Sequence, residues 1–330
     1  MKISKYLAAA VTAMAIVMAA VVPAAAAPAP GKHRIAFVNV GGEGPNVGNV
    51  AAFRDGMREL GYIEGRNLEI EFRWGNNNPS ALPALVSELL ATKPAVIVST
   101  GGPPTIKAVK AATSTIPVVF ITGDPLVEGI VTSLARPGGN LTGFSVLANN
   151  LDPKRLELLR QLLPRAKRLA MISNPDRPSA EANVRIVVEA AKGLGFEVQQ
   201  WEVRDAAELT RALPQIAEAK VDALFIGADP VLGFERERIV AFARANRLPG
   251  VYFWKEFAEL GGLTSFGTSL PEIYRRAAMY VDKILKGAKP GELPIELPTK
   301  FELVVNRTAA KELGIEIPKS LLQRADVVIN

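Results

Sequence analysis

Two short runs of branched and aromatic residues each end in small polar residues that are able to bind a ligand. Residues 96–98 lead into Ser99, Thr100 and two glycines that begin with Gly101, and residues 118–121 lead into Thr122 and a nearby acidic residue, Asp124. The hydroxyl groups can donate hydrogen bonds, and the exposed amides at the glycines can bind an anion. Alternatively, the first group of residues only caps the following helix. The pattern predicts one wall of a binding site.

A glycine-rich turn follows the first predicted strand, residues 33–40. It contains Gly41 and Gly42, and a predicted helix begins at Asn49. A strand, a glycine-rich turn and a helix also occur in this order in dinucleotide sites, but the glycine spacing does not fit G-x-G-x-x-G. A helix N-terminus that faces a cleft, with Gly41 and Gly42 beside it, is therefore preferred over a nucleotide site.

The second half of the chain supplies its own polar and aromatic candidates near predicted strand ends. Asn174 and Asp229 each precede a proline, and Phe253, Trp254 and Phe266 are aromatic. Carboxylates bind ammonium groups, and aromatic rings form platforms for the apolar part of a ligand. Each residue also has a structural alternative, since Asn and Asp favour turns and aromatic residues favour the core.

The composition argues against several classes of protein. The chain has no cysteine and a single histidine, His33, which argues against Cys/His nucleophiles and Cys/His metal sites. No acidic loop with the spacing of a Mg²⁺ or Ca²⁺ site is visible either. The net charge of +6 is spread through amphipathic segments, so no nucleic-acid partner is expected. We therefore expect no cofactor and no catalytic residue.

Strands and helices alternate along the chain in two series of similar length. The predicted strands are residues 33–40, 68–74, 96–98, 118–121, 141–146, 169–172, 197–203, 223–226, 251–254, 263–266 and 301–305. The predicted helices are residues 49–60, 83–92, 105–113, 152–163, 179–193, 206–219, 236–246 and 272–286. This order predicts an α/β fold with two doubly wound parallel-sheet lobes, and ligands of such sheets bind beyond the carboxyl ends of the strands. The binding site is therefore expected between the lobes.

The lobes are expected to exchange segments near the end of the chain. Lobe 1 is predicted to contain residues 33–143 and 268–292, and lobe 2 residues 144–267 and 293–330. This division follows by analogy of topology, in which the tail returns to the first lobe and then to the second. It predicts a hinge made of several strands.

The first residues have the features of an export signal. Lys2 and Lys5 precede an apolar run over residues 6–22, and Ala24 and Ala26 satisfy A-x-A. We expect a signal peptide over residues 1–27, cleaved near Ala26 or Ala27, and an exported periplasmic protein. A retained membrane anchor is the alternative, whereas a lipid anchor is excluded because no cysteine follows the cleavage zone.

Several motifs resemble those of a known family over nearly the whole mature chain. They are Gly123-Asp124-Pro125, S-L-A-R-P-G-G-N-L-T-G over residues 133–143, P-T-K-F-E-L-V-V-N over residues 298–306, Ile317-Pro318 and Arg324-Ala325-Asp326. With these motifs the chain is similar to the TrpX-like solute-binding proteins of ABC importers. The resemblance implies a type I periplasmic-binding-protein fold, a cleft that closes on a small solute, and delivery to a membrane permease. Members of the family are associated with aromatic amino acids.

An amino-acid-like ligand would use the predicted site residues in two ways. Its carboxylate would bind Thr100, Gly101 and Thr122, and its ammonium group would bind Asp124 or Asp229. A monomeric solute receptor that is not an enzyme explains the export signal, the two series and the absence of catalytic residues. The alternatives are a periplasmic sensor that presents its ligand to a membrane receptor, and a secreted enzyme with paired carboxylates.

Overall fold

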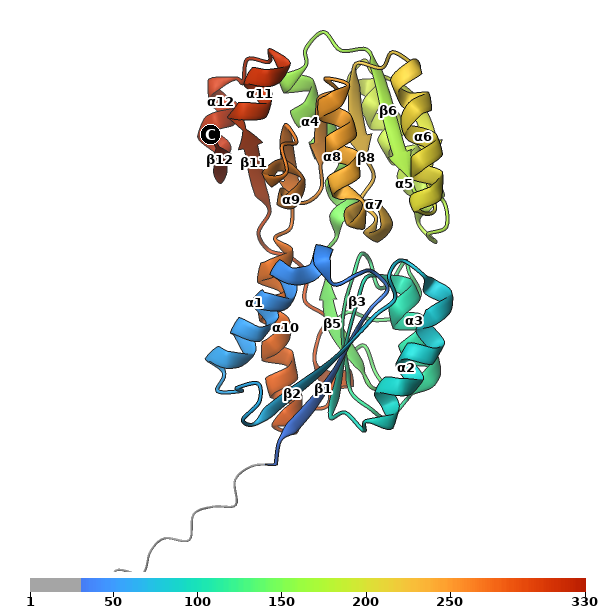
Figure 1. Cartoon of the computed structure of the whole chain (residues 1–330), viewed down its shortest axis with the longest axis vertical. Coiled ribbons are helices and arrows are strands. Elements are labelled where there is room, and N and C mark those ends of the chain that lie inside the picture. Colours follow the sequence, from blue (N-terminus) through green and yellow to red (C-terminus); the bar gives the residue numbers. More distant parts are fainter. Residues whose placement is uncertain (1–30) are drawn as a thin grey trace, which may run out of the picture. The chain divides into compact units, whose positions relative to one another are not determined.

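The computed structural model describes residues 31–330, and residues 32–330 form one compact unit with two β-sheets (Figure 1). The first sheet has the order β2-β1-β3-β4-β5, and all its neighbours are parallel. Its strands are β1 (His33–Asn39), β2 (Leu68–Trp74), β3 (Val96–Thr100), β4 (Val118–Thr122) and β5 (Leu141–Ser145). Strands β3 to β5 are buried along their whole length, as expected for parallel strands covered on both faces.

Four helices accompany this sheet and complete lobe 1. They are α1 (Val47–Glu59), α2 (Leu82–Ala91), α3 (Pro103–Ala112) and α10 (Leu270–Leu285). Helix α10 lies far along the chain but packs against α1, where a Cβ atom at Gly56 would come within 2.6 Å of the Arg275 carbonyl oxygen. The Tyr62 hydroxyl donates a hydrogen bond of 2.9 Å to Asp282 of α10. These contacts fasten α10 to lobe 1.

The second sheet, in lobe 2, has the order β12-β11-β10-β9-β8-β6-β7. Its strands are β6 (Arg168–Ser173), β7 (Glu197–Glu202), β8 (Ala223–Ile226), β9 (Gly250–Tyr252), β10 (Thr264–Gly267), β11 (Glu302–Asn306) and β12 (Val327–Ile329). Among these described strands, only β10 and β11 pair antiparallel. The helices of lobe 2 are α4 (Asp152–Leu162), α5 (Ala180–Gly193), α6 (Ala206–Glu218), α7 (Pro230–Phe234), α8 (Arg236–Ala245), α9 (Lys255–Glu259), α11 (Arg307–Leu313) and α12 (Lys319–Arg324).

The described chain passes between the two sheets three times: after β5, after β10 and before β11. In the third passage, Glu296 still pairs with lobe 1, because its carbonyl accepts a 2.9 Å bond from the Ser145 amide. The buried Arg155 of α4 connects the first passage to the end of β10 by donating hydrogen bonds to the Ala148 and Phe266 carbonyls. Its charge is balanced by Asp152.

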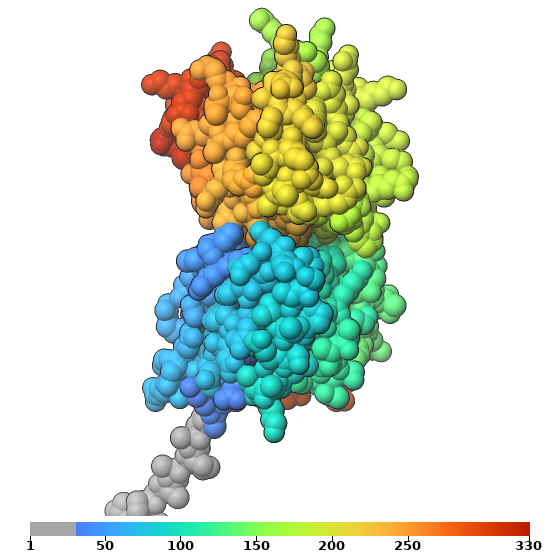
Figure 2. Space-filling view, turned by 45° about the vertical axis from the view of Figure 1, so that its right-hand side comes forward, coloured from blue at the N-terminus to red at the C-terminus, as the bar shows by residue number. Residues whose placement is uncertain are grey.

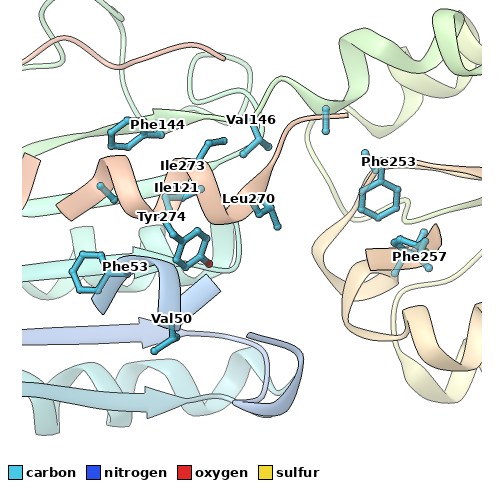
Figure 3. Close-up of a cluster of buried hydrophobic side chains, with 14 of the residues drawn as sticks. Val50, Phe53, Ile121, Phe144, Val146, Phe253, Phe257, Leu270, Ile273 and Tyr274 are labelled. Atoms are coloured by element: carbon cyan, nitrogen blue, oxygen red, sulfur yellow. The ribbon is translucent and has the colours of Figure 1, made fainter. Parts of the chain in front are cut away.

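One apolar cluster continues from lobe 1 into lobe 2 through the passage segments. Figure 3 shows Val146 and Leu270 between Tyr274 on the lobe 1 side and Phe253 and Phe257 on the lobe 2 side. Contacts of this kind stabilise both lobes through the same residues, since burial of apolar surface is the main favourable term in folding.

The prediction of two doubly wound parallel-sheet lobes is confirmed. The predictions omitted α7, α9, α11, α12 and β12, none of which has more than seven residues, too few to show a hydrophobic period. The predicted signal peptide over residues 1–27 lies outside the described residues. Within residues 31–330, no helix is long and apolar enough to span a membrane.

Candidate functional site

A cavity lies between the carboxyl ends of the strands of the two lobes. The space between its lining atoms, including the opening to solvent, is about 1090 Å³. In the space-filling view, the blue and cyan surface of lobe 1 meets the yellow and orange surface of lobe 2 along one boundary (Figure 2). The residues after β1 and β3 and those after β6 and β8 line the cavity, which matches the topological switch point of each sheet.

The lobe 1 wall consists mainly of backbone amides and neutral polar side chains. Helix α3 begins at the cavity with Gly101 and Gly102 before it, and α1 begins there after Asn46. Amide groups in the first turn of a helix have no partner within the helix, and the helix dipole adds positive potential. The lobe 1 wall is thus suited to an anion such as a carboxylate.

A buried hydrogen-bond network holds the residues of this wall in place. Asn39 lines the cavity, donates a 2.8 Å hydrogen bond to the Thr100 hydroxyl and accepts one of 2.6 Å from the Gly41 amide. Burial raises the pKa of Tyr274 to about 12, although hydrogen bonds with Thr100 and Asn39 oppose the shift. The Tyr274 hydroxyl therefore stays protonated at neutral pH and is able to donate a hydrogen bond in the cavity.

The lobe 2 wall carries most of the charged side chains of the cavity. Arg177, Asp229, Arg236 and Glu256 all line it. Asp229 caps α7 by accepting a 2.8 Å hydrogen bond from the Val231 amide. Arg236 donates hydrogen bonds to the carbonyls of Gly233 in its own lobe and Pro45 in lobe 1. The Asp229 carboxylate and the Arg236 guanidinium are therefore already engaged within the protein.

Glu256 differs from these residues because no ion pair to it occurs within 4 Å among residues 31–330. Burial raises the pKa of the Glu256 carboxyl above its usual value, and Glu259 adds to the shift, whereas its own backbone amide, Arg236 and Lys255 oppose it. A desolvated carboxylate without a close cation is stabilised when a ligand supplies an ammonium group.

Four aromatic residues line the cavity together with aliphatic residues such as Ile121 and Leu270. Phe234, Phe253 and Trp254 come from lobe 2, and Tyr274 comes from lobe 1. The rings of Phe253 and Trp254 pack edge to face with their centroids 4.7 Å apart. The Nε1 atom of Trp254 is buried and has no hydrogen-bond partner in the described part of the chain. Buried donors are normally paired, so this atom is a candidate for a polar contact with a ligand.

A buried network connects the two walls at one side of the cavity. Glu128 of lobe 1 accepts hydrogen bonds from the Thr122 hydroxyl and from the Arg177 guanidinium of lobe 2. Arg177 also donates a 3.0 Å hydrogen bond to the Ala228 carbonyl and lies 3.7 Å from Asp229. Since Glu128 is only 2% exposed, this ion pair is well shielded from water.

The structure brings half of the sequence-predicted site residues to the cavity. Those that line it are Gly101, Thr122, Asp124, Asp229 and Trp254. Their contacts with a ligand remain predictions. The hydroxyl of Thr122 and the carboxylate of Asp229 belong to the network between the lobes, so both side chains already have partners.

The other five predicted residues are not among those that line the cavity. Thr100 lies opposite Asn39 on the neighbouring strand and accepts its hydrogen bond, and Asn174 donates a 3.3 Å hydrogen bond to Asp229. Gly41 is covered by the Phe234 ring, and the Gly42 carbonyl accepts a hydrogen bond from Asn46.

Phe266 is the fifth of these residues and lies apart from the cavity. Its ring packs against Phe301 and a cluster formed by α4, β11 and the C-terminal helices. Periodicity alone does not show which side of β10 the ring faces.

Sequence reasoning missed Glu256, Arg177 and Glu128. Glu256 and Arg177 lie four residues after the ends of β9 and β6, and Glu128 lies six residues after the end of β4. Because ligands bind beyond the ends of strands, the position of each residue could have indicated it as a candidate. All of the predicted site residues lie in a strand or within three residues after its end, whereas these three lie further along the chain. Short elements such as α9 carry side chains back to the cavity from further along the chain.

Comparisons with known proteins agree with this geometry. A family model described as ABC transporter substrate binding protein matches residues 40–329. A tyrosine-binding protein of Clostridioides difficile (strain R20291) is 25% identical over 265 residues, which cover 80% of this chain and 76% of that protein.

Two solved structures extend the comparison. A conserved domain protein from Vibrio cholerae has a TM-score of 0.82 at 28% identity, covering 90% of this chain and 99% of that chain. An ABC domain from Streptococcus pneumoniae in complex with L-Trp has a TM-score of 0.81 at 24% identity, covering 90% of this chain and 100% of that chain. The second likeness establishes the fold alone.

Proposed function

Because the chain belongs to the ABC transporter substrate-binding protein family, we propose that it is the periplasmic receptor of an ABC importer for an amino acid with an aromatic side chain. The receptor binds its ligand in the cavity between the lobes, closes about the hinge and delivers the ligand to a membrane permease. Closure is favoured because the ligand contacts both walls only in the closed state. The protein acts as a monomer and releases its ligand unchanged.

The observation that carries this proposal is the division of polar groups between the two walls. The lobe 1 wall presents amide donors at two helix N-termini, and the lobe 2 wall presents Glu256 without an ion-pair partner in the described chain. An amino acid carries an anionic carboxylate and a cationic ammonium group on the same carbon atom. It can therefore satisfy both walls at once.

In this arrangement the ligand carboxylate binds the amides near Gly101 and Gly102, with the Tyr274 hydroxyl as an additional donor. The ammonium group binds Glu256, and Asp124 supplies a second carboxylate at the lobe 1 side. This assignment replaces Asp229 as the ammonium ligand, because the Asp229 carboxylate already faces Arg177 and caps α7.

The aromatic lining supports a ligand with an aromatic side chain. Phe234, Phe253 and Trp254 offer ring surfaces, and aromatic contacts add to the free energy of burial. The similarity to a tyrosine-binding protein supports the same class of ligand. Export by the predicted signal over residues 1–27 would place this receptor in the periplasm.

The proposal is tested with the chain that begins at residue 28, by calorimetric titration with L-tyrosine, L-tryptophan, L-leucine and D-ribose. L-Tyrosine or L-tryptophan should bind and raise the melting temperature, and a hundredfold excess over Kd adds about 2.7 kcal/mol of stability. Analogues that lack the amino group, such as 3-(4-hydroxyphenyl)propanoate, should bind much more weakly. Binding of the analogue as tightly as L-tyrosine would refute the role of Glu256, and binding of ribose alone would refute the class of ligand.

The absence of catalysis is tested in the same samples. Chromatography of the ligand after long incubation should recover it unchanged. Conversion of the ligand to a product would refute a pure receptor.

A further inference from the structure

Helix α7 of lobe 2 meets lobe 1 at two glycines. In Figure 1 this short helix lies at the edge of lobe 2 that faces lobe 1. A Cβ atom at Gly102 would come within 2.9 Å of Cγ of Pro230, and a Cβ atom at Gly41 would overlap the tip of the Phe234 ring. Pro230 and Phe234 are four residues apart, so they lie on the same face of the helix.

The two glycines occupy matching positions just beyond the ends of two neighbouring strands. Strands β1 and β3 pair in parallel with Asn39 opposite Thr100, and Gly41 and Gly102 each follow two residues later. Lobe 1 therefore presents two adjacent positions without side chains to the two projecting residues of α7. Each of these residues packs directly against the backbone of lobe 1.

Phe234 contributes to the packing of lobe 1 although it belongs to lobe 2. Its ring is half-buried and packs against the lobe 1 cluster that contains Val40, Ile106 and Phe120. When the lobes separate, the ring must leave this cluster. Its contact with Gly41 thus exists only while the lobes are together.

The two glycines differ in why a side chain is disfavoured. Gly102 has a φ of +90°, so its own backbone already favours glycine. Gly41 is not among the residues with positive φ, and the three atoms nearest to its ideal Cβ position all belong to Phe234. Apart from Gly41 itself and its two chain neighbours, no described atom of lobe 1 lies as close to that position. The constraint on Gly41 therefore comes from lobe 2.

We propose that Gly41 is the docking position for Phe234 in the closed state, so that a side chain at residue 41 blocks closure without disturbing the fold of lobe 1. The inference rests on the proposed function, because closure is part of it. It deepens that function by identifying a residue that sets ligand affinity and does not line the cavity. Gly41 and Phe234 act as positioning residues for the closed state.

The test measures the distance between the lobes directly. The sequence has no cysteine, so Lys107→Cys in α3 and Arg211→Cys in α6, both at exposed positions, provide the only two thiols for spin labels. Pulsed electron paramagnetic resonance then gives the distance distribution without ligand and with saturating L-tyrosine or L-tryptophan. The wild type should populate the short distance of the closed lobes, and Gly41→Ala should lose this population while its circular dichroism is unchanged.

A double-mutant cycle separates the docking contact from the other roles of Phe234. Gly41→Ala should weaken binding of L-tyrosine about tenfold or more in the wild-type background, as expected for overpacking. In the Phe234→Ala background the same substitution should change Kd less than about twofold, because the clash is gone. Gly193→Ala is the matched control, because a Cβ atom at Gly193 would have no neighbour within 4 Å. It should change neither the Kd nor the distance distribution between the lobes.

The outcomes distinguish failure of the docking proposal from failure of the proposed function. Closure of Gly41→Ala to the same extent as the wild type would overturn the docking proposal alone. An equal effect of Gly41→Ala in both backgrounds would also overturn it, since the effect would then not depend on Phe234. A wild type that never populates the short distance, with or without either amino acid, would overturn both the docking proposal and the closing receptor.

Discussion

The two walls of the cavity are built from different chemical groups. The lobe 1 wall consists mainly of glycines, asparagines and the starts of α1 and α3, whereas the lobe 2 wall carries Arg177, Arg236 and Glu256 together with three aromatic rings. Backbone amides and helix dipoles recognise an anion whatever the rest of the ligand is. Charged and aromatic side chains also select the remainder of the ligand. The comparison indicates that the lobe 1 wall binds the anionic group common to many ligands, whereas the lobe 2 wall selects among ligands by the rest of their structure.

Glu128 is the exception in lobe 1, because it is a buried acid beside a largely neutral wall. Its carboxylate bonds to Thr122 and Arg177. A buried ion pair contributes little net stability, but loss of one partner leaves an uncompensated charge and is strongly unfavourable. The pair therefore makes the closed arrangement sensitive to either residue. The Glu128 carboxylate thus binds Arg177 of the other lobe, whereas the Glu256 carboxylate is free to bind the ligand.

The largest effect is expected from Glu256→Gln, which removes the carboxylate of the lobe 2 wall that has no ion-pair partner among residues 31–330. A hydrogen bond to a charged group contributes about 1.5–3 kcal/mol, so the Kd for L-tyrosine should rise about 10- to 100-fold. Calorimetric titration measures the change. Glu259→Gln on the same helix, at an exposed residue paired with Lys255, is the control and should change Kd less than about twofold, because Glu259 does not line the cavity and acts on Glu256 only through its charge. Equal effects of the two substitutions would remove Glu256 from the ammonium site.

The pH dependence of binding gives a second test of the lobe 2 wall. The pKa of Glu256 is raised in the free protein, mainly by burial, and a bound ammonium group would favour the charged carboxylate and lower this pKa. Binding therefore releases a proton, and affinity should fall as the pH is lowered through the raised pKa, by at most about tenfold per pH unit. Titrations from neutral pH down to the ordinary value of a glutamate carboxyl, 4.5, measure the slope. Glu256→Gln should remove this dependence, and a slope that persists in the variant would assign the proton to another group.

A smaller effect is expected from Glu128→Gln, which weakens the contact between the walls without removing a group that lines the cavity. Arg177 keeps Asp229 at 3.7 Å as a second anion, and the new amide oxygen can still accept its hydrogen bond, so the charge is not left uncompensated. The Kd should therefore rise only about 3- to 10-fold, mainly through faster dissociation, because the contact forms after encounter. Stopped-flow fluorescence separates the two rate constants. Glu64→Gln, which breaks the exposed pair with Arg54 in lobe 1, should change neither rate constant. A slower association with unchanged dissociation would contradict the role of Glu128 in holding the lobes together.

Much of the fold was predictable from the sequence because buried parallel strands are continuous apolar runs. Strand β2 was predicted with its observed limits, residues 68–74, and its alternation of apolar and polar residues is typical of the edge position that it occupies in the sheet. Helix α7 was not predictable, because five residues that include a proline and a glycine have no helical period. Its existence depends on the Asp229 cap and on packing in the folded protein.

The candidate site was predictable only in part, because a sequence shows positions along a strand and not the partners of a side chain. The strand-end rule correctly directed attention to the region of Thr122 and Asp229. It did not reveal that Glu128 and Arg177 contact these side chains, since Arg177 and Glu128 come from different lobes and meet only in the folded protein. Glu256 was missed for a related reason, because a short helix brings it back to the cavity.

The smallest effect is expected from Asp124→Asn, which tests whether lobe 1 takes part in binding the ammonium group. The Asp124 carboxylate lines the cavity, but one of its oxygens already accepts hydrogen bonds from the Leu126 and Val127 amides. Asparagine keeps an acceptor oxygen for these amides, so the Kd for L-tyrosine should change less than about threefold. The same titration as for Glu256→Gln measures it. A larger loss of affinity for Asp124→Asn than for Glu256→Gln would reverse the comparison between the walls, because the carboxylate that binds the ammonium group would then lie in lobe 1.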